Sequence, residues 1–159
     1  MKRIILFRHG KSGWDLAVSD IDRDLEKSGK IRTRKSAEAL KNKINFEIDA
    51  WFSSPATRAR KTAEITAGYF NQNKIEINDS FYTFSFFDLL KEIKKLDSRF
   101  NTVIIFGHNE AFTEFVNRMG NQYIDNLPTS GVAIIEFAAD EWNEIEKGVT
   151  QLIIKPKNL

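Results

Sequence analysis

Cysteine is absent from this sequence, and histidine occurs only twice. The lack of cysteine excludes disulfide bonds and thiolate chemistry, and it is compatible with a reducing cytoplasm. No apolar run approaches the roughly 20 residues that a membrane-spanning helix needs. The amino terminus leads directly into a strand pattern without the apolar region of a signal peptide. We therefore expect a cytoplasmic protein that has no membrane partner.

The sequence also lacks a strong excess of either charge. Lys and Arg number 24 against 22 Asp and Glu, which leaves a net charge of +2, and the basic residues are dispersed along the chain. Because nucleic acid binding depends on a concentrated basic surface, we expect no nucleic acid partner. The 159 residues and the apolar fraction of 42% predict a single domain over residues 1–159.

Both histidines occur in the same setting, at the end of an apolar strand pattern and beside a glycine. The first apolar run, residues 4–7, is followed by Arg8 and His9; the second, residues 102–106, is followed by a glycine and His108. The first run predicts a strand that is buried on both faces. Ligands of open α/β sheets bind beyond the carboxyl ends of the strands. We therefore expect the two imidazoles to share one site.

The rest of the chain alternates between helical and strand patterns. Helices are expected from residue 26 or 28 to 43 and at 57–70, 86–96 and 109–119, and further strands at 48–52, 75–77, 132–137 and 149–154. The buried face of the first helix is expected to contain Ile31, Ala37, Leu40 and Ile44. An aromatic segment at 81–87 is interpreted as core or as the wall of a pocket. This alternation predicts an α/β fold with a mainly parallel sheet covered on both faces.

Arg58 lies in the first turn of the helix expected at 57–70, where a cation opposes the helix dipole. It could be a tolerated surface residue, or it could face a bound anion together with the free N–H groups of the helix end. With Arg8, His9 and His108 it would provide two guanidiniums and two imidazoles. Guanidinium groups match phosphate oxygens in geometry, and a neutral imidazole can attack phosphorus. The set predicts phosphoryl transfer without a metal or cofactor.

A metal site is the alternative interpretation of two histidines, since a carboxylate could complete the ligand set. However, each histidine is flanked by a candidate anion-binding residue, and neither an HExxH motif nor a His/Cys cluster occurs.

Three blocks of sequence, in the right order, resemble the histidine phosphatase superfamily, which has the phosphoglycerate mutase-like fold. They are Arg8-His9-Gly10-Lys11-Ser12, the segment 53–64, and Gly107-His108-Asn109. The short chain, the Lys-Ser-Gly-Trp sequence at 11–14 and the segments 22–25 and 127–132 resemble the SixA-type phosphohistidine phosphatase branch. The resemblance covers essentially the whole chain and implies a three-layer α/β/α sandwich.

The resemblance also implies roles for individual residues. His9 would be the nucleophile that is phosphorylated, and the phosphoryl group would be bound by Arg8, Arg58, His108, Ser12 and Asn109. The expected activity is that of a metal-independent phosphohydrolase, with phosphohistidine in a protein as the substrate. Two alternatives stay open: a non-catalytic module that binds phosphate or a phosphopeptide, and a phosphomonoesterase for a small phosphorylated metabolite.

The sequence departs from the family pattern at two points. Asp15 stands where many of the phosphomonoesterases have Asn, and a carboxylate beside a phosphate is repulsive unless it is turned away or protonated, so Asp15 is a possible site residue. An acidic proton donor before the second histidine is not evident. Asp88 is expected in the first turn of a helix, where a carboxylate is simply stabilising. A missing acid favours a substrate with a good leaving group, such as phosphohistidine, and it also motivates the non-catalytic alternative.

Overall fold

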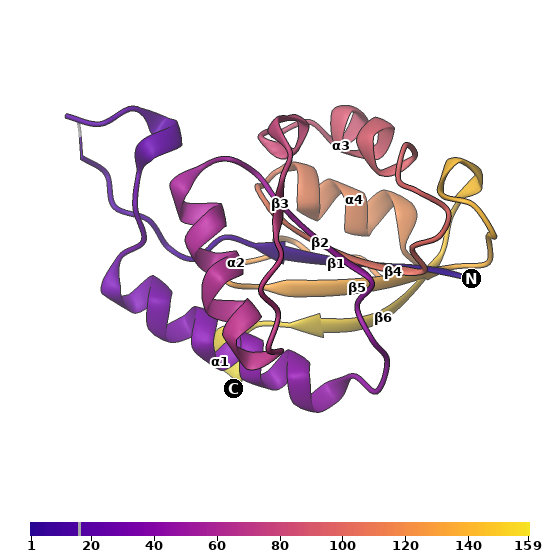
Figure 1. The fold of residues 1–159 in the computed structure, drawn as a ribbon, viewed down its shortest axis with the longest axis horizontal. Coiled ribbons are helices and arrows are strands. Elements are labelled where there is room, and N and C mark those ends of the chain that lie inside the picture. Colours follow the sequence, from indigo (N-terminus) through magenta and orange to yellow (C-terminus); the bar gives the residue numbers. More distant parts are fainter. Residues whose placement is uncertain (16) are drawn as a thin grey trace.

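The computed structural model describes residues 1–15 and 17–159, which form one six-stranded sheet with helices on both faces (Figure 1). The sheet has the order β3-β2-β4-β1-β5-β6. The strands are β1 (Lys2–Arg8), β2 (Ala50–Ser53), β3 (Glu76–Ile77), β4 (Thr102–Gly107), β5 (Val132–Phe137) and β6 (Val149–Ile154). The helices are α1 (Lys27–Lys43), α2 (Thr57–Tyr69), α3 (Phe86–Ile93) and α4 (Ala111–Met119).

The sheet is mainly parallel, as predicted. Strands β3, β2, β4 and β1 run parallel to one another, whereas β5 is antiparallel to both of its neighbours, β1 and β6. Helices α1 and α2 cover one face of the sheet, and α3 and α4 cover the other (Figure 1). The three-layer α/β/α arrangement of the phosphoglycerate mutase-like fold is thereby confirmed.

The central strand β1 is buried on both faces, which confirms the prediction from its apolar run. Ile4 and Leu6 join the core beneath α3 and α4, while Ile5 and Phe7 join the core beneath α1 and α2. All four side chains are 0% exposed. Burial of each such side chain contributes about 1.5–3 kcal/mol, so β1 is the strand on which both layers depend.

The helix predictions need correction at two places. Ile31 is 44% exposed, because the buried face of α1 is formed by Gly29, Thr33, Ser36, Ala37 and Leu40. Ile31 follows Gly29 by two positions and so projects from the opposite side of the helix. Helix α3 ends at Ile93 rather than at residue 96, and i→i+3 hydrogen bonds such as Leu96 N to Ile93 O tighten the chain beyond it.

The ends of β1, β4 and β2 lie side by side at one edge of the sheet. Arg8 is opposite Gly107, and Ser53 is opposite Phe106. The alignment continues one residue further, since the His9 N–H donates to the Gly107 carbonyl at 3.1 Å. The residues that follow β1, β4 and β2 therefore lie close together at this edge of the sheet. Among the described residues, no helix has the length and apolar character needed to cross a membrane.

Candidate active site

His9 and His108 face each other at this edge, with ring centroids 5.3 Å apart. The His9 side chain is 7% exposed, and its Nδ1 lies 2.7 Å from the carbonyl oxygen of Gly10. A carbonyl oxygen only accepts hydrogen bonds, so Nδ1 carries the proton. The other ring nitrogen, Nε2, therefore presents a lone pair, and it lies 3.4 Å from the Arg58 Nε.

His108 is held between aromatic rings and a serine hydroxyl. Tyr82 and Phe84 each approach its ring edge to face, at a centroid distance of 5.3 Å. Its Nε2 lies 2.8 Å from the Ser54 hydroxyl, and its Nδ1 lies 3.4 Å from an Arg58 terminal nitrogen. Guanidinium cannot accept a hydrogen bond, so Nδ1 is the acceptor there and Nε2 donates to Ser54. Because a hydroxyl can reverse its role, Ser54 also permits the tautomer in which Nδ1 donates to an oxygen.

Arg58 connects the two imidazoles. It projects from the first turn of α2 and is 1% exposed, with Nε directed at His9 and a terminal nitrogen directed at His108. The alternative of a surface arginine is therefore wrong. A guanidinium has only N–H donors, so those of Arg58 are directed toward the space beside the two rings.

Arg8 completes the group from the end of β1. One terminal nitrogen donates to the Leu127 carbonyl at 2.8 Å, while its buried Nε has no hydrogen-bond partner among the described residues. Buried donors are satisfied in the great majority of protein structures. The Arg8 Nε–H is an exception to this pattern among the described residues.

The electrostatic environment keeps both imidazoles neutral. Burial, with a smaller contribution from the nearby Arg58 and Arg8, lowers the pKa of His9 to about 3, although the hydrogen bond to the Gly10 carbonyl acts to raise it. Burial, His9 and Arg58 lower the pKa of His108 to about 2. The Nε2 of His9 is therefore unprotonated throughout the physiological pH range, and its lone pair accepts a hydrogen bond from the Arg58 Nε.

Three further residues were predicted to belong to the site, and the structure gives each of them contacts outside the group of imidazoles and guanidiniums. They are Ser12, Asn109 and Asp15. Ser12 is buried where the chain after β1 bridges to Leu25. The Asn109 side chain accepts from Thr113 and donates to Asn126, so its amide joins α4 to the loop whose Leu127 carbonyl binds Arg8. Asp15 is exposed, and its carboxylate accepts from the Ala17 N–H at 2.9 Å.

Two residues that the sequence interpretation missed contact the site. Asp20, in a 3₁₀ turn at Asp20–Asp22, accepts hydrogen bonds from Arg58, and the Tyr82 hydroxyl donates to the same carboxylate. In the sequence, Asp20 is one of several acidic residues before the first helix, and nothing distinguishes it from Asp22 or Asp24. Tyr82 belongs to the aromatic segment 81–87, where Phe81 is buried in the core but Phe84 is 52% exposed. The sequence does not distinguish Asp20 and Tyr82 from the residues around them, and only the folded structure shows that both contact the site.

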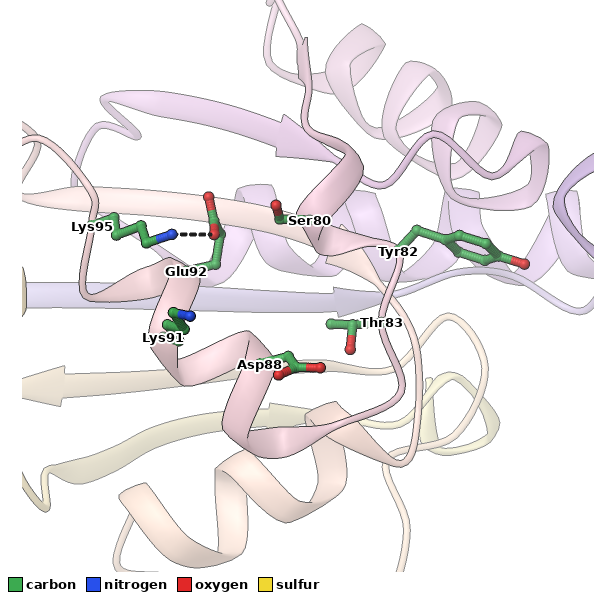
Figure 2. A pocket seen from close by; sticks show the side chains of 7 residues that line it. All are labelled: Ser80, Tyr82, Thr83, Asp88, Lys91, Glu92 and Lys95. Carbon is green, nitrogen blue, oxygen red and sulfur yellow. Dashed lines mark hydrogen bonds and ion pairs between the residues drawn. The ribbon is translucent and has the colours of Figure 1, made fainter.

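A groove of about 330 Å³ lies beside α3, adjacent to the site (Figure 2). It is lined by Ser80, Tyr82, Thr83, Asp88, Lys91, Glu92 and Lys95. Figure 2 shows that the Tyr82 ring extends away from the other lining side chains, and the same ring packs edge to face against His108. Asp88 lies in the first turn of α3, as predicted. Among the described residues, no group of three or more His, Asp and Glu side chains could hold a metal ion.

An α/β/α sandwich that gathers two histidines and two arginines at its strand ends is the arrangement of the histidine phosphatases. The sequence profile of the histidine phosphatase superfamily, branch 1, matches residues 4–119. The chain belongs to this superfamily and is a phosphatase.

The chain is also similar to individual proteins and structures. An uncharacterised chloroplastic protein of Arabidopsis thaliana is 27% identical over 154 residues, which cover 90% of this chain and 70% of that protein. The protein histidine phosphatase SixA complexed with tungstate has the same fold, with a TM-score of 0.82, 22% identity and 98% of both chains covered. The crystal structure of the putative phosphohistidine phosphatase SixA from Agrobacterium tumefaciens is similar, with a TM-score of 0.81, 23% identity and 98% of both chains covered.

Proposed function

We propose that this protein hydrolyses phosphohistidine in a protein substrate through a phosphorylated His9 intermediate. One observation carries the proposal: the unprotonated Nε2 of His9 faces the Arg58 guanidinium beside the His108 ring, while Gly10 holds the proton on the other ring nitrogen. Phosphoryl transfer depends mainly on positioning and on stabilising charge at the transferred oxygens. Both are provided by these four side chains.

In the first step, Nε2 of His9 attacks phosphorus and the bond from phosphorus to the leaving nitrogen breaks. Arg8, Arg58 and the Nδ1–H tautomer of His108 donate to the phosphoryl oxygens as charge develops. The departing imidazole nitrogen takes up a proton from solvent. In the second step, water attacks the phosphorus of phospho-His9, which releases inorganic phosphate and restores neutral His9.

The choice of substrate rests on the state of the acidic group nearest the site. The Asp20 carboxylate accepts hydrogen bonds from Tyr82 and Arg58, and these contacts lower its pKa. An ionised carboxylate cannot protonate a leaving alkoxide, which favours a substrate whose leaving group needs little assistance. The P–N bond of phosphohistidine meets this requirement. A protein substrate is supported further by the polar groove beside Tyr82, which could receive residues that flank the phosphorylated side chain.

The test uses an aryl phosphate and a phosphohistidine-containing protein, both assayed with EDTA present. The wild type is expected to turn over both, and the substitution His9→Ala to reduce turnover below detection while circular dichroism and thermal melting stay those of a folded protein. Brief reaction with a radiolabelled substrate should leave acid-labile label on His9. Unchanged turnover in the variant would refute the proposal.

The two alternatives give different results in the same assays. A non-catalytic module would bind the phosphorylated protein without releasing phosphate and without labelling His9. A phosphomonoesterase for metabolites would prefer a small phosphate ester by its specificity constant over the phosphorylated protein.

A further inference from the structure

We propose that Asp20 is a positioning residue that holds the Arg58 guanidinium in its reactive orientation, with Tyr82 holding Asp20 in turn. This inference rests on the proposed function, in which Arg58 binds the transferred phosphoryl group. It assigns a role to a carboxylate that is 38 residues away from Arg58 in the sequence.

The guanidinium of Arg58 has two differently engaged edges. Its Nε and one terminal nitrogen approach the imidazoles of His9 and His108, both at 3.4 Å. Asp20 binds the end of the guanidinium: one terminal nitrogen donates to the Asp20 backbone carbonyl at 2.6 Å, and the nitrogen that approaches His108 also donates to the Asp20 carboxylate at 3.1 Å. That shared nitrogen has two N–H groups, so one can be held by Asp20 while the other faces His108. The donors that face the imidazoles keep their direction.

Asp20 is itself held from two further sides. The Tyr82 hydroxyl donates to the same carboxylate oxygen that Arg58 contacts, and the Arg23 Nε donates to the other oxygen at 3.2 Å. The Arg23 guanidinium lies 3.7 Å from the centroid of the Trp14 ring. Tyr82 also packs against His108. The network therefore joins the turn at 20–22, α2 and the aromatic segment around one guanidinium.

Charge explains why a carboxylate is needed at this place. Arg58 is almost completely buried, and its nearest neighbours in the site are two neutral imidazoles and the cationic Arg8. A buried cation needs a charged or polar partner to offset its desolvation. Asp20 provides that partner and also fixes the planar fork of donors. The contact between Asp20 and Arg58 matters because small errors in the placement of a catalytic group can reduce rates about 100-fold.

An opposite interpretation would make Asp20 an internal competitor that occupies Arg58 in place of phosphate. The two interpretations predict opposite signs. If Asp20 competes, its removal raises turnover and tightens oxyanion binding. If Asp20 positions Arg58, its removal lowers kcat and weakens binding of an oxyanion whose geometry resembles the transition state.

The experiment is a double-mutant cycle with Asp20→Ala, Arg58→Ala and the combined variant, measured by kcat and KM and by the affinity for orthovanadate. Asp20→Ala is expected to lower kcat by about 10- to 100-fold, to change KM less, and to weaken vanadate binding. In the Arg58→Ala background the same substitution should have no further effect, because the residue through which Asp20 acts is gone. Tyr82→Phe should lower kcat by a smaller factor in the wild type and by none in Asp20→Ala.

The matched control is Asp22→Asn, which changes a carboxylate in the same turn that accepts a hydrogen bond from the Ser19 hydroxyl. This variant is expected to keep wild-type turnover. The inference would be overturned if Asp20→Ala lowered kcat by the same factor in the wild type and in the Arg58→Ala background. Increased turnover of the Asp20→Ala variant would also overturn it. If the wild type neither labels His9 nor turns over substrate, the proposed function fails. The vanadate arm of the cycle still decides the role of Asp20 in that case.

Discussion

At the scale of single residues, His9 and His108 differ in which ring nitrogen carries the proton. The Gly10 carbonyl fixes the proton of His9 on Nδ1, whereas Arg58 and Ser54 favour the proton of His108 on Nε2. The backbone of the residue that follows His9 therefore determines which nitrogen can attack. This assignment could not have been made from the sequence, because it depends on the direction of one carbonyl group.

The tautomers can be measured by NMR. Since the chain contains only two histidines, long-range ¹H–¹⁵N spectra resolve both rings, and His108→Asn identifies the signals of His9. Both rings should be neutral at pH 5, because burial lowers the pKa of His9 to about 3 and that of His108 to about 2. The proton of His9 should be on Nδ1. A ring of His9 that titrates near pH 6.5 would contradict the assignment of burial as the dominant effect.

At the scale of secondary structure, the turn after β1 depends on close contact with α1. A Cβ atom on Gly29 would lie 2.3 Å from the backbone oxygen of Lys11, two residues after His9. The α1 backbone thus supports the segment that follows His9, and a side chain at position 29 would push this segment away.

Gly29→Ala should therefore lower the free energy of unfolding by about 1–3 kcal/mol and reduce turnover as well. Gly68→Ala is the matched control, because no atom lies within 4 Å of the added Cβ in α2. Alanine is the better helix former, so the control should raise stability by about 0.5–1 kcal/mol with unchanged activity. Chemical denaturation measures both. Equal stability of the two variants would show that the contact between Gly29 and Lys11 carries no energy.

The sequence predicted the elements and the meeting of His9, His108 and Arg58, because strand ends in a parallel sheet share one edge: the histidines stand at strand ends, and Arg58 is in the first turn of the helix that follows β2. It could not predict the contact of Asp20 with Arg58. Asp20 lies in a short turn without periodicity, and nothing local distinguishes it from Asp22 or Asp24. The position of Ile31 was also predicted incorrectly, since the small residues that face the sheet in α1 give a weak hydrophobic pattern.

At the scale of the whole molecule, two buried neutral imidazoles make stability depend on pH. In the unfolded chain a histidine has a pKa of about 6.5, whereas the folded-state pKa values of His9 and His108 are about 3 and about 2. Below pH 6.5 the unfolded state binds more protons than the folded state. Stability is therefore complete above pH 6.5 and is lost as the pH falls toward the folded-state values.

Between pH 7 and pH 5, the free energy of unfolding should fall by roughly 2 kcal/mol for each histidine. The pKa values of Asp20 and Asp24 are lowered from 3.8, so these carboxylates contribute only at more acidic pH. Urea denaturation at several pH values provides the measurement. The combined variant His9→Asn and His108→Asn should show little slope over this range, and a slope equal to that of the wild type would assign the effect to other groups. The cytoplasmic location and a phosphorylated protein as partner stay predictions.

The order of strands has a consequence for synthesis. Strand β1 emerges first, yet its two neighbours in the sheet are β4 and β5, which begin at Thr102 and Val132. The central strand must therefore stay unpaired while most of the polypeptide is translated, and pairing between such distant segments is intrinsically slow. A nascent chain shortened before residue 102 would expose the apolar segment Ile4-Ile5-Leu6-Phe7 to chaperones and would lack His108, so the two imidazoles could not meet.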